Sequence, residues 1–441
     1  MNLQTRRIGL EQEFFLVDET GLISEDADKF LQACREVAIK QDCNTQYFVP
    51  EFVKCMVEIN TPPTYTDMEL GYEYLKNLKI AVTAARKIGL RLYPLSSYPL
   101  HITPVMRDHL NYHIQARTVG YERFLHAGKC TGTHLHLEVA PGIIDERVAV
   151  SYNSTATERE ELLNIYNLAT ALDSALVSLA RACPFYEGQA LGLASHTIRY
   201  RGSEKFGWEG VYTHLQAVGG LMPYAHCVES LVEQQFARYY AWLEAMDKAV
   251  IERHLFLEAG GSLLKSAWNP IRLNKLGTVE IRCIDSNYPS VILTIISLVY
   301  NAACRVRNEG LKVRPAKGLH VFDLDGSYLW VPDFEYLNGD LLYAAATEGI
   351  NNSKVKNYVD SILNFAIANR NEAAKYLTQL KTKLDNHTTT ETEILQKFTP
   401  TIAELSQDDG LRLVRESCDQ LEQELKLLDN HHSSVLLNTS D

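Results

Sequence analysis

Two glutamates stand two positions apart near the start of the chain, at Glu11 and Glu13 within residues 7–18. The segment has the composition of a β-strand, and side chains at alternate positions of a strand share one face. Two carboxylates held side by side repel each other unless a positive charge lies between them, and a divalent cation is the usual solution. The alternative is an edge strand whose acids face water.

Acids and imidazoles recur in three later segments that show the same alternation of polar and apolar residues. Their polar sides carry Glu58, with Glu51 just before its strand, then His134, His136 and Glu138, and then Glu280 and Arg282. If the four strands belong to one sheet, their apolar faces pack on helices and their polar faces form one basin. Oxygen-rich ligation with a single imidazole suits Mg²⁺ or Mn²⁺. The pattern therefore predicts a cation site that could hold nucleotide phosphates.

Each of these residues also has a simpler interpretation. His134 and His136 could be a surface pair, and Arg282 beside Glu280 could be a plain salt bridge. Glu138 is better explained as a structural residue than as a catalytic one. The phosphate-binding patterns GxxxxGK(S/T) and GxGxxG are absent from the sequence, so a nucleotide site here would lack a phosphate loop.

The rest of the chain supplies elements that could position these residues. Strands are expected over residues 6–18, 53–60, 90–97, 132–139 and 277–285, and helices over 26–40, 66–89, 157–183, 225–250 and 289–307. Region 184–224 is rich in glycine and aromatic residues without a clear period, which is typical of active-site loops. After a β-like piece at 320–331, helices are expected at about 340–383, 391–406 and 409–429.

Composition narrows the class of protein. The chain has 441 residues, of which 46% are hydrophobic and 22% charged, and a formal net charge of −12, which argues against a nucleic-acid partner. Its nine cysteines are scattered without a CxxC pair, which favours reduced thiols in a cytoplasmic protein. The first residues show no secretory signal, and the absence of a long uncharged apolar run argues against a membrane partner.

With these motifs in order, the chain resembles glutamate–cysteine ligase family 2, the carboxylate–amine ligases of the glutamine-synthetase-like superfamily. The resemblance extends over about residues 1–310. It rests on Gly9-Leu10-Glu11-Gln12-Glu13, the segment from Glu51 to Glu58, Gly132-Thr133-His134-Leu135-His136, Gly277 to Asp285, and Pro184-Phe185-Tyr186-Glu187-Gly188 followed by Ser195 and Arg199. Gln12 departs from many relatives, and the loops at 101–128 and 195–215 match poorly, which leaves the substrates open.

The resemblance implies an α+β fold of the glutamine-synthetase and guanidino-kinase type. A mainly antiparallel, curved sheet would form the active-site floor, with helices packed outside it. Residues 1–340 would be the catalytic domain, 341–430 a helical region packed on it, and 431–441 a flexible tail.

The resemblance also implies ATP as co-substrate with two or three Mg²⁺ ions, Mn²⁺ being the alternative ion. By position, the metal ligands would be Glu11, Glu13, Glu51, Glu58, His134 and Glu280. Arg282 would bind the transferred phosphate, and Arg199 or Arg201 would contact phosphate or a substrate carboxylate. The implied reaction joins two amino acids through an acyl phosphate, with glutamate and cysteine as the family default.

Three alternatives remain at this point. A ligase of the same family could join a different amino-acid pair. A guanidino-type phosphotransferase shares the superfamily fold and would release a phosphagen instead of an amide. A non-catalytic metal- or metabolite-binding protein could have kept the fold, although clustered acids without cations are costly. The expected partners are amino acids and ATP, and a homo-oligomer is an open alternative to a monomer.

Overall fold

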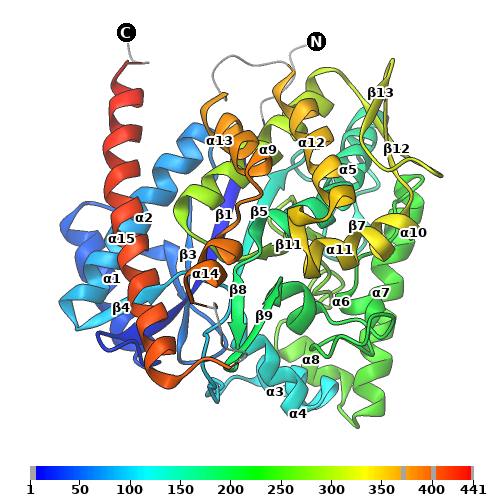
Figure 1. The fold of residues 1–441 in the computed structure, drawn as a ribbon. Coiled ribbons are helices and arrows are strands. Elements are labelled where there is room, and N and C mark those ends of the chain that lie inside the picture. The colour runs from blue at the N-terminus through cyan, green and yellow to red at the C-terminus, as the bar shows by residue number, and fades with distance from the viewer. Residues whose placement is uncertain (1–5, 369–373, 399–403, 439–441) are drawn as a thin grey trace.

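The computed structural model describes residues 6–368, 374–398 and 404–438 (Figure 1). Its centre is a seven-stranded sheet with the order β10-β11-β5-β1-β3-β2, in which β4 also pairs with β1. The strands are β1 (Ile8–Asp18), β2 (Phe48–Pro50), β3 (Met56–Asn60), β4 (Leu90–Tyr93), β5 (Gly132–Glu138), β10 (Ile271–Asn274) and β11 (Thr278–Asp285). Their pairings are antiparallel, so the expected antiparallel sheet within a mixed α and β fold is confirmed.

Three long helices cover the sheet. α2 (Asp67–Lys87) and α5 (Ala156–Ala180) contact its strands, and α9 (Pro289–Asn308) packs against both helices. The other helices are α1 (Ala27–Lys40), α3 (Leu110–Val119), α4 (Tyr121–Phe124), α6 (Gln216–Gly219), α7 (Val228–Lys248), α8 (Arg253–Glu258), α10 (Phe334–Tyr336), α11 (Leu342–Thr347), α12 (Ser353–Ile367), α13 (Ala374–Asp385), α14 (Thr390–Phe398) and α15 (Gln407–Asn438).

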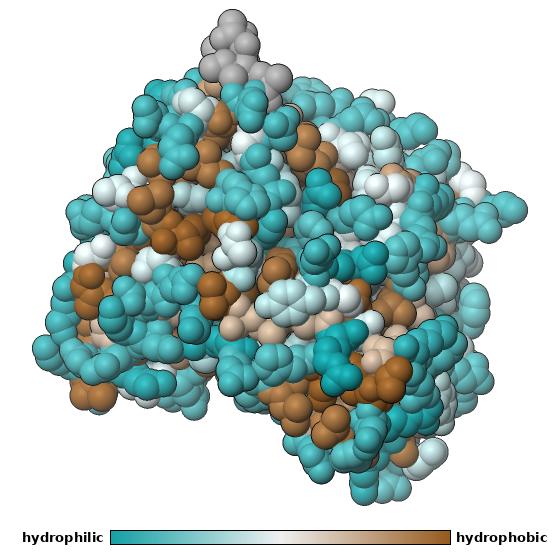
Figure 2. Space-filling model, turned by 90° about the horizontal axis from the view of Figure 1, so that it is seen from below, coloured by the Kyte–Doolittle hydropathy of each residue, from teal (hydrophilic) through white to brown (hydrophobic). Residues whose placement is uncertain are grey.

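Three small sheets complete the fold. β12 (Lys312–Ala316), β14 (Tyr328–Pro332) and β13 (Asp323–Asp325) form the first, β6 (Ile144–Asp145) and β7 (Ala149–Val150) the second, and β8 (Cys183–Tyr186) and β9 (Gln189–Leu193) the third. The β8–β9 hairpin lies almost wholly within residues 184–224, which the sequence predicts to be loops. The molecular face in Figure 2 is mostly hydrophilic with separate hydrophobic areas.

The helix-facing side of β1 explains why this strand forms at the centre of the sheet. Ile8, Leu10, Phe14 and Leu16 are almost completely buried, as their alternation predicts. Gln12 lies among them with no exposed surface. Its amide is satisfied, because Tyr74 Oη donates to Oε1 at 2.6 Å and Nε2 donates to the carbonyl of Asn287 at 2.9 Å. The opposite side of β1 is thereby left to Glu11 and Glu13.

Helices α5 and α9 are long and apolar enough to cross a membrane by length and composition alone. The absence of a long uncharged apolar run in the sequence had predicted no such helix. In the structure, 94% of the apolar window of α5 and 72% of that of α9 are buried inside the protein. Packing against the sheet and against other helices accounts for their apolar composition.

The C-terminal part is helical, as predicted. α12 and α13 pack against α9, α14 contacts the β8–β9 hairpin, and α15 lies along α2 and β4. Arg91 of β4 is almost buried and pairs with Asp419 and Glu422 of α15 at 2.6 and 2.9 Å. The flexible tail predicted over residues 431–441 overlaps the end of α15, which continues through Asn438; its flexibility stays a prediction, and residues 439–441 lie outside the described part.

Two regions that the sequence left without regular structure contain short elements. Residues 101–128 include α3 and α4, and residues 184–224 include the β8–β9 hairpin and a π-helical turn, His196–Arg201. Such turns are too short for a hydrophobic period to show in the sequence. Both regions border the polar side of the sheet.

Candidate metal and phosphate site

Strand register places the acids and histidines on one face of the sheet. Glu13 on β1 lies opposite Glu58 on β3, and Glu11 lies opposite His134 on β5. His136 on β5 in turn lies opposite Glu280 on β11. Directly opposite residues of an antiparallel pair point to the same side, so the four predicted segments do share one polar face.

This face forms the floor of a cavity of about 280 Å³. Five of the six predicted metal ligands line it, together with Arg282 and residues from α3, α4 and the π-helical turn. The lining residues are Glu11, Glu13, Glu51, Phe52, Met56, Glu58, Asn111, Tyr112, Gln115, Phe124, Ala127, Cys130, His134, Tyr200, Trp268, Arg272 and Arg282. Glu280 has no exposed surface and lies beneath Arg272 and Arg282.

The ligand atoms gather into three groups that could each hold a cation. Within each group the atoms lie within 4.8 Å of one another. The groups are Glu13 with Glu51 and Glu58, Glu11 with Glu58 and His134, and Glu11 with His136 and Glu280. Glu11 and Glu58 are each shared by two groups, so cations bound here would be close neighbours. The structure thus adds His136 to the predicted ligand set.

The group of Glu13, Glu51 and Glu58 has the least favourable electrostatics for three ionised carboxylates. Burial raises the pKa of Glu13 well above its usual value, and the charge of Glu51 raises it further, against the N–H of Gly132, which donates to Glu13 Oε2 at 2.7 Å. Burial is also the main cause of the raised pKa of Glu51. For Glu58, burial and then the charges of Glu11, Glu51 and Glu13 raise the pKa well above its usual value. The charge of Arg282 lowers the pKa of Glu13 and of Glu51 but does not outweigh burial and the neighbouring acids.

The other acids are balanced by neighbouring bases. Burial opposes ionisation of Glu11, but His136 and His134 outweigh it and hold the pKa of Glu11 below its usual range. Burial likewise opposes ionisation of Glu280, but Arg272 and Arg282 hold its pKa well below the usual value. Arg272 Nε and Arg282 Nη1 lie 2.7 and 2.6 Å from the Glu280 oxygens. Arg282 and Glu280 therefore do form the salt bridge that the simpler interpretation of the sequence predicted.

The donor set fits a divalent cation. Burial and the charge of Arg282 lower the pKa of His134 to about 4, so its imidazole is neutral at neutral pH. His134 Nδ1 lies 3.1 Å from Glu11 Oε2 and 3.3 Å from the donor Arg282 Nη1, and the shorter contact, to the carboxylate, favours the proton on Nδ1. Nε2 is buried without a hydrogen-bond partner in the described structure, 3.8 Å from Glu13 Oε1. A lone pair and a carboxylate that face each other need a positive charge between them.

The predicted arginines separate into different environments. Arg282 lines the cavity beside Tyr200, and although burial opposes its charge, the carboxylate of Glu280 outweighs burial and raises the pKa of Arg282. Neither Arg199 nor Arg201 is among the described residues that line the cavity. Arg201 is buried and committed to Asp173 at 2.9 Å and to the side-chain oxygen of Asn338 at 2.5 Å.

Arg199 lies behind the cavity wall. Its guanidinium covers the ring of Tyr186 at 4.7 Å, and Nη1 donates to the carbonyl of Glu209 at 3.4 Å. Its Nε is buried without a hydrogen-bond partner in the described structure. Of the two arginines, Arg199 is therefore the one with a donor available for a ligand.

Sequence reasoning missed several residues of the site. Arg272 binds Glu280 with two nitrogens, at 2.7 and 3.1 Å, but β10 carries no acid that would have drawn attention to it. Tyr200 and Trp268 come from irregular segments. His136 stands in the same alternation as His134, so the strand pattern alone could have included it.

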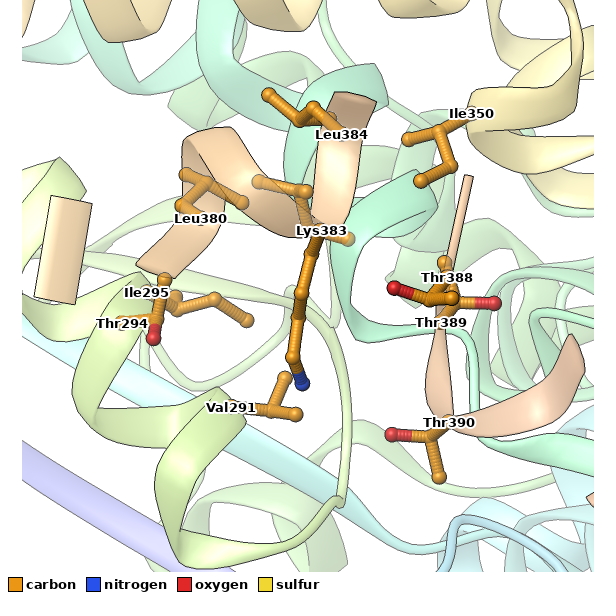
Figure 3. A pocket seen from close by; sticks show the side chains of 11 residues that line it. Val291, Thr294, Ile295, Ile350, Leu380, Lys383, Leu384, Thr388, Thr389 and Thr390 are labelled. Atoms are coloured by element: carbon orange, nitrogen blue, oxygen red, sulfur yellow. The ribbon is translucent and has the colours of Figure 1, made fainter. Parts of the chain in front are cut away.

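A separate hollow of about 30 Å³ lies between α9, α13 and the start of α14 (Figure 3). Leu380, Leu384 and Ile350 surround it with threonines 388–390, and the Lys383 side chain runs along it. A space of this size holds one or two water molecules. It is therefore excluded as a substrate site.

Comparison with known proteins agrees with the resemblance seen in the motifs. Residues 7–203 match Glutamate-cysteine ligase family 2. A Pseudomonas aeruginosa protein with the provisional name glutamate–cysteine ligase 2 is 26% identical over 192 residues, 43% of this chain and 45% of that protein. A Jannaschia protein of the same provisional name is 26% identical over 197 residues, again 43% and 45%. The match therefore spans less than half of these relatives' length.

Solved structures with a similar fold extend the likeness to the whole chain. A bifunctional glutathione synthetase from Pasteurella multocida has a TM-score of 0.53 at 15% identity, over 95% of this chain and 53% of that chain. A glutamate–cysteine ligase from Francisella tularensis, solved in complex with AMP, has a TM-score of 0.52 at 11% identity, over 99% and 94%. At these identities the likeness concerns the fold.

Proposed function

From the match of residues 7–203 to glutamate-cysteine ligase family 2, we propose that this protein is an ATP-dependent carboxylate–amine ligase. In its most specific version, the proposal is that the enzyme joins glutamate and cysteine into γ-glutamylcysteine. The observation that carries the proposal is the set of three adjoining ligand groups on one sheet face, next to the guanidinium of Arg282. Such a face suits the polyphosphate of a nucleotide with its metal ions.

Two or three Mg²⁺ ions would be held by Glu11, Glu13, Glu51, Glu58 and Glu280 with the imidazoles of His134 and His136. When bound, they would neutralise phosphate charge and polarise the γ-phosphate for transfer. Arg282 would stabilise negative charge on the transferring phosphoryl group. Its own orientation is fixed by the buried carboxylate of Glu280, 2.6 Å from Nη1.

The proposed reaction has two steps. A substrate carboxylate oxygen bonds to the γ-phosphorus, and the bond from that phosphorus to ADP breaks, which gives an acyl phosphate. The amine of the second amino acid then bonds to the acyl carbon, phosphate leaves, and the amine proton passes to solvent. Aromatic residues of the cavity, among them Phe52, Phe124 and Trp268, would keep water from the acyl phosphate.

Arg199 is the proposed contact for a substrate carboxylate, because its Nε has no partner in the described structure. Reaching the cavity would require its side chain to leave the ring of Tyr186. Arg201 is not proposed for this role, since its charge is balanced by Asp173. A cytoplasmic location and the division at residue 340 remain predictions.

The test is a screen of amino-acid pairs with ATP and Mg²⁺, read by mass spectrometry of the product. Glutamate labelled with ¹⁸O in its γ-carboxylate should transfer one label to the released phosphate, because the acyl phosphate passes one oxygen to phosphorus. The matched variants are Glu51→Gln at the site and Glu138→Gln, whose side chain pairs with Arg7 outside the cavity.

The outcomes separate the alternatives. An amide that forms from another pair keeps the ligase and changes its substrates. A phosphorylated single substrate without released phosphate supports a guanidino-type phosphotransferase. Metal-dependent nucleotide binding without turnover of any pair supports a non-catalytic binder, and unlabelled phosphate contradicts the acyl-phosphate route.

A further inference from the structure

Asp285 ends β11, three residues after Arg282, and its carboxylate is buried. Four donors surround it. Oδ2 accepts from Ser96 Oγ at 2.9 Å and from the N–H groups of Ala182 and Ser195 at 3.2 and 3.1 Å. Oδ1 accepts from the N–H of His196 at 2.9 Å. A carboxylate that accepts several backbone N–H groups is a strong, directional anchor.

Two of these donors begin the π-helical turn His196–Arg201. The first N–H groups of a helical turn have no partner within the turn, and Asp285 supplies one for Ser195 and His196. Ser195 is the N-cap residue of the turn, but its side chain makes no capping hydrogen bond. Burial raises the pKa of Asp285 to about 6 against these hydrogen bonds, so the group is mainly ionised at pH 7 and can accept at both oxygens.

The anchored turn contacts β11, the strand that carries Asp285, a second time through Tyr200. Tyr200 of the turn lines the cavity beside Arg282 of β11. Its ring stacks on His196 with centroids 4.6 Å apart and planes at 12°. The contacts thus run from β11 through Asp285 and the turn to Tyr200, and from Tyr200 back to Arg282 of β11.

The same turn also reaches the backbone that holds Glu13. A Cβ added at Gly132 would lie 2.9 Å from two atoms of the His196 ring, so the ring packs directly on this glycine. The N–H of Gly132 donates to Glu13 Oε2. The pairing of β5 with β1 and β11 keeps this N–H in place for Glu13, so a displaced turn would disturb Arg282 and leave the anchor of the proposed metal ligand intact.

We propose that Asp285 is a positioning residue that fixes the His196–Arg201 turn, and through Tyr200 the Arg282 guanidinium, for the proposed phosphoryl transfer. The expected effect of Asp285 on catalysis rests on the proposed function. Asp285 itself touches neither the cavity nor its ligand groups in the described structure. Its part in organising the turn stands on the geometry alone.

The test variant is Asp285→Asn, which keeps the shape but turns an NH₂ toward at least one N–H donor. We expect faster amide hydrogen exchange in residues 195–202, unchanged exchange in β5 and β1, and a kcat about 10- to 100-fold lower, the cost of a small misplacement at a reacting group. The Kd for Mg²⁺ alone should stay within about twofold, since the metal ligands keep their own anchors. Tyr200→Phe should lower kcat, and the double variant should lose little more.

The control is Asp67→Asn, which alters another buried carboxylate: Asp67 Oδ2 accepts from Ser297 Oγ at 2.8 Å, and neither residue lines the cavity. It should lower the unfolding midpoint without changing kcat. If Asp285→Asn does not fold, Ser96→Ala removes one donor and should change exchange and kcat in the same direction by less.

Two results would overturn the positioning role: unchanged exchange in residues 195–202, or independent, multiplying effects of Asp285→Asn and Tyr200→Phe on kcat. A wild-type protein that turns over no amino-acid pair overturns the proposed function instead. In that case the affinity for Mg²⁺ with a non-hydrolysable ATP analogue replaces kcat. Weaker analogue binding in Asp285→Asn, with Mg²⁺ binding retained, would support the positioning role.

Discussion

At position 280 a carboxylate without exposed surface is held between two guanidinium groups. Arg272 and Arg282 bind Glu280 from either side, and Asn274 donates to it as well, at 2.5 Å. Taking one partner out of a buried ion pair leaves the remaining charges uncompensated. The residue therefore serves the fold as well as the proposed chemistry, and the two roles can be measured separately.

Glu280→Gln should lower the free energy of unfolding by about 3 kcal/mol, because Arg272 and Arg282 would remain buried without their counter-charge. It should also abolish turnover. Urea unfolding and ADP release measure the two effects. Glu138→Gln is the matched control: its partner Arg7 is partly exposed, so the loss should stay below about 1 kcal/mol. Equal losses in the two variants would contradict the buried-triad interpretation.

The acids Glu13, Glu51 and Glu58 predict a pH dependence. Their pKa values are raised in the folded protein, mainly by burial. Without cations, the stability contributed by their protonated forms is full below about pH 4.3, the unfolded value. It is lost as the pH rises through the folded values. Mg²⁺ binds the ionised forms, so its stabilising effect should grow in the same direction.

The measurement is the shift in Tm on adding MgCl₂ at pH 5.5 and at pH 8. At 100 times Kd, the cation should stabilise the protein by about 2.7 kcal/mol, and the shift should be larger at pH 8. Glu13→Gln combined with Glu58→Gln should remove most of the difference between the two pH values. An equal shift at both pH values in the wild type would refute the proposed proton–metal competition.

At the level of elements, β5 and the π-helical turn meet at one glycine. Gly132→Ala would place a Cβ 2.9 Å from the His196 ring, so the turn must move. We expect a loss of about 1–3 kcal/mol in the free energy of unfolding, the usual cost of overpacking, and a lower kcat. Gly9→Ala on β1 is the control, because its Cβ would lie 3.8 Å from the nearest atom, in ordinary contact. Wild-type behaviour of Gly132→Ala would show that the turn is not held by this contact.

Elements with a strong period were predictable from sequence, and irregular ones were not. Polar and apolar residues alternate in the first half of β1 and from Thr278 to Cys283 of β11, so the shared face of Glu11 with Glu13, and the side occupied by Glu280, follow from local geometry. The ends of α2 were found to within two residues of Asp67–Lys87, since Thr66 accepts from the N–H of Glu69, as in a capping box. The π-helical turn has no such local signature, because Asp285 that anchors it lies far away in sequence.

For the whole molecule, strand order decides which residues meet. The sequence supplied four polar faces, and only the pairing of β1 with β3 and β5, and of β5 with β11, brings them together. The pairings of β5 with β1 and with β11 join segments more than a hundred residues apart, and the sheet depends on the packing of α2, α5 and α9. The resemblance to a known family supplied the expectation of one antiparallel sheet, which periodicity could not, and the strand order came only from the structure. Arg201 shows the limit of that route, since the resemblance implied a contact with phosphate or substrate but its guanidinium pairs with Asp173.

The C-terminal helices should be required for folding of the whole chain. α12 buries Val355, Val359, Ile362 and Leu363, and α15 buries Leu413, Val414 and Leu421. Each such side chain contributes about 1.5–3 kcal/mol, so their sum is comparable to the entire stability of a domain, about 5–15 kcal/mol. A chain ending at residue 340 would also expose the apolar faces of α5 and α9 that these helices cover.

We therefore expect residues 1–340 alone to aggregate, or to remain expanded and bind a hydrophobic dye, whereas residues 1–438 should unfold cooperatively like the full chain. Circular dichroism and dye fluorescence measure both. Supplying residues 341–441 as a separate chain should restore Mg²⁺ binding only if the two parts associate through the α9–α12 contact, which Ile362→Asp would disrupt. A cooperative unfolding transition of residues 1–340 alone would instead show that the predicted catalytic domain is an independent folding unit, with the helices docked on a finished core.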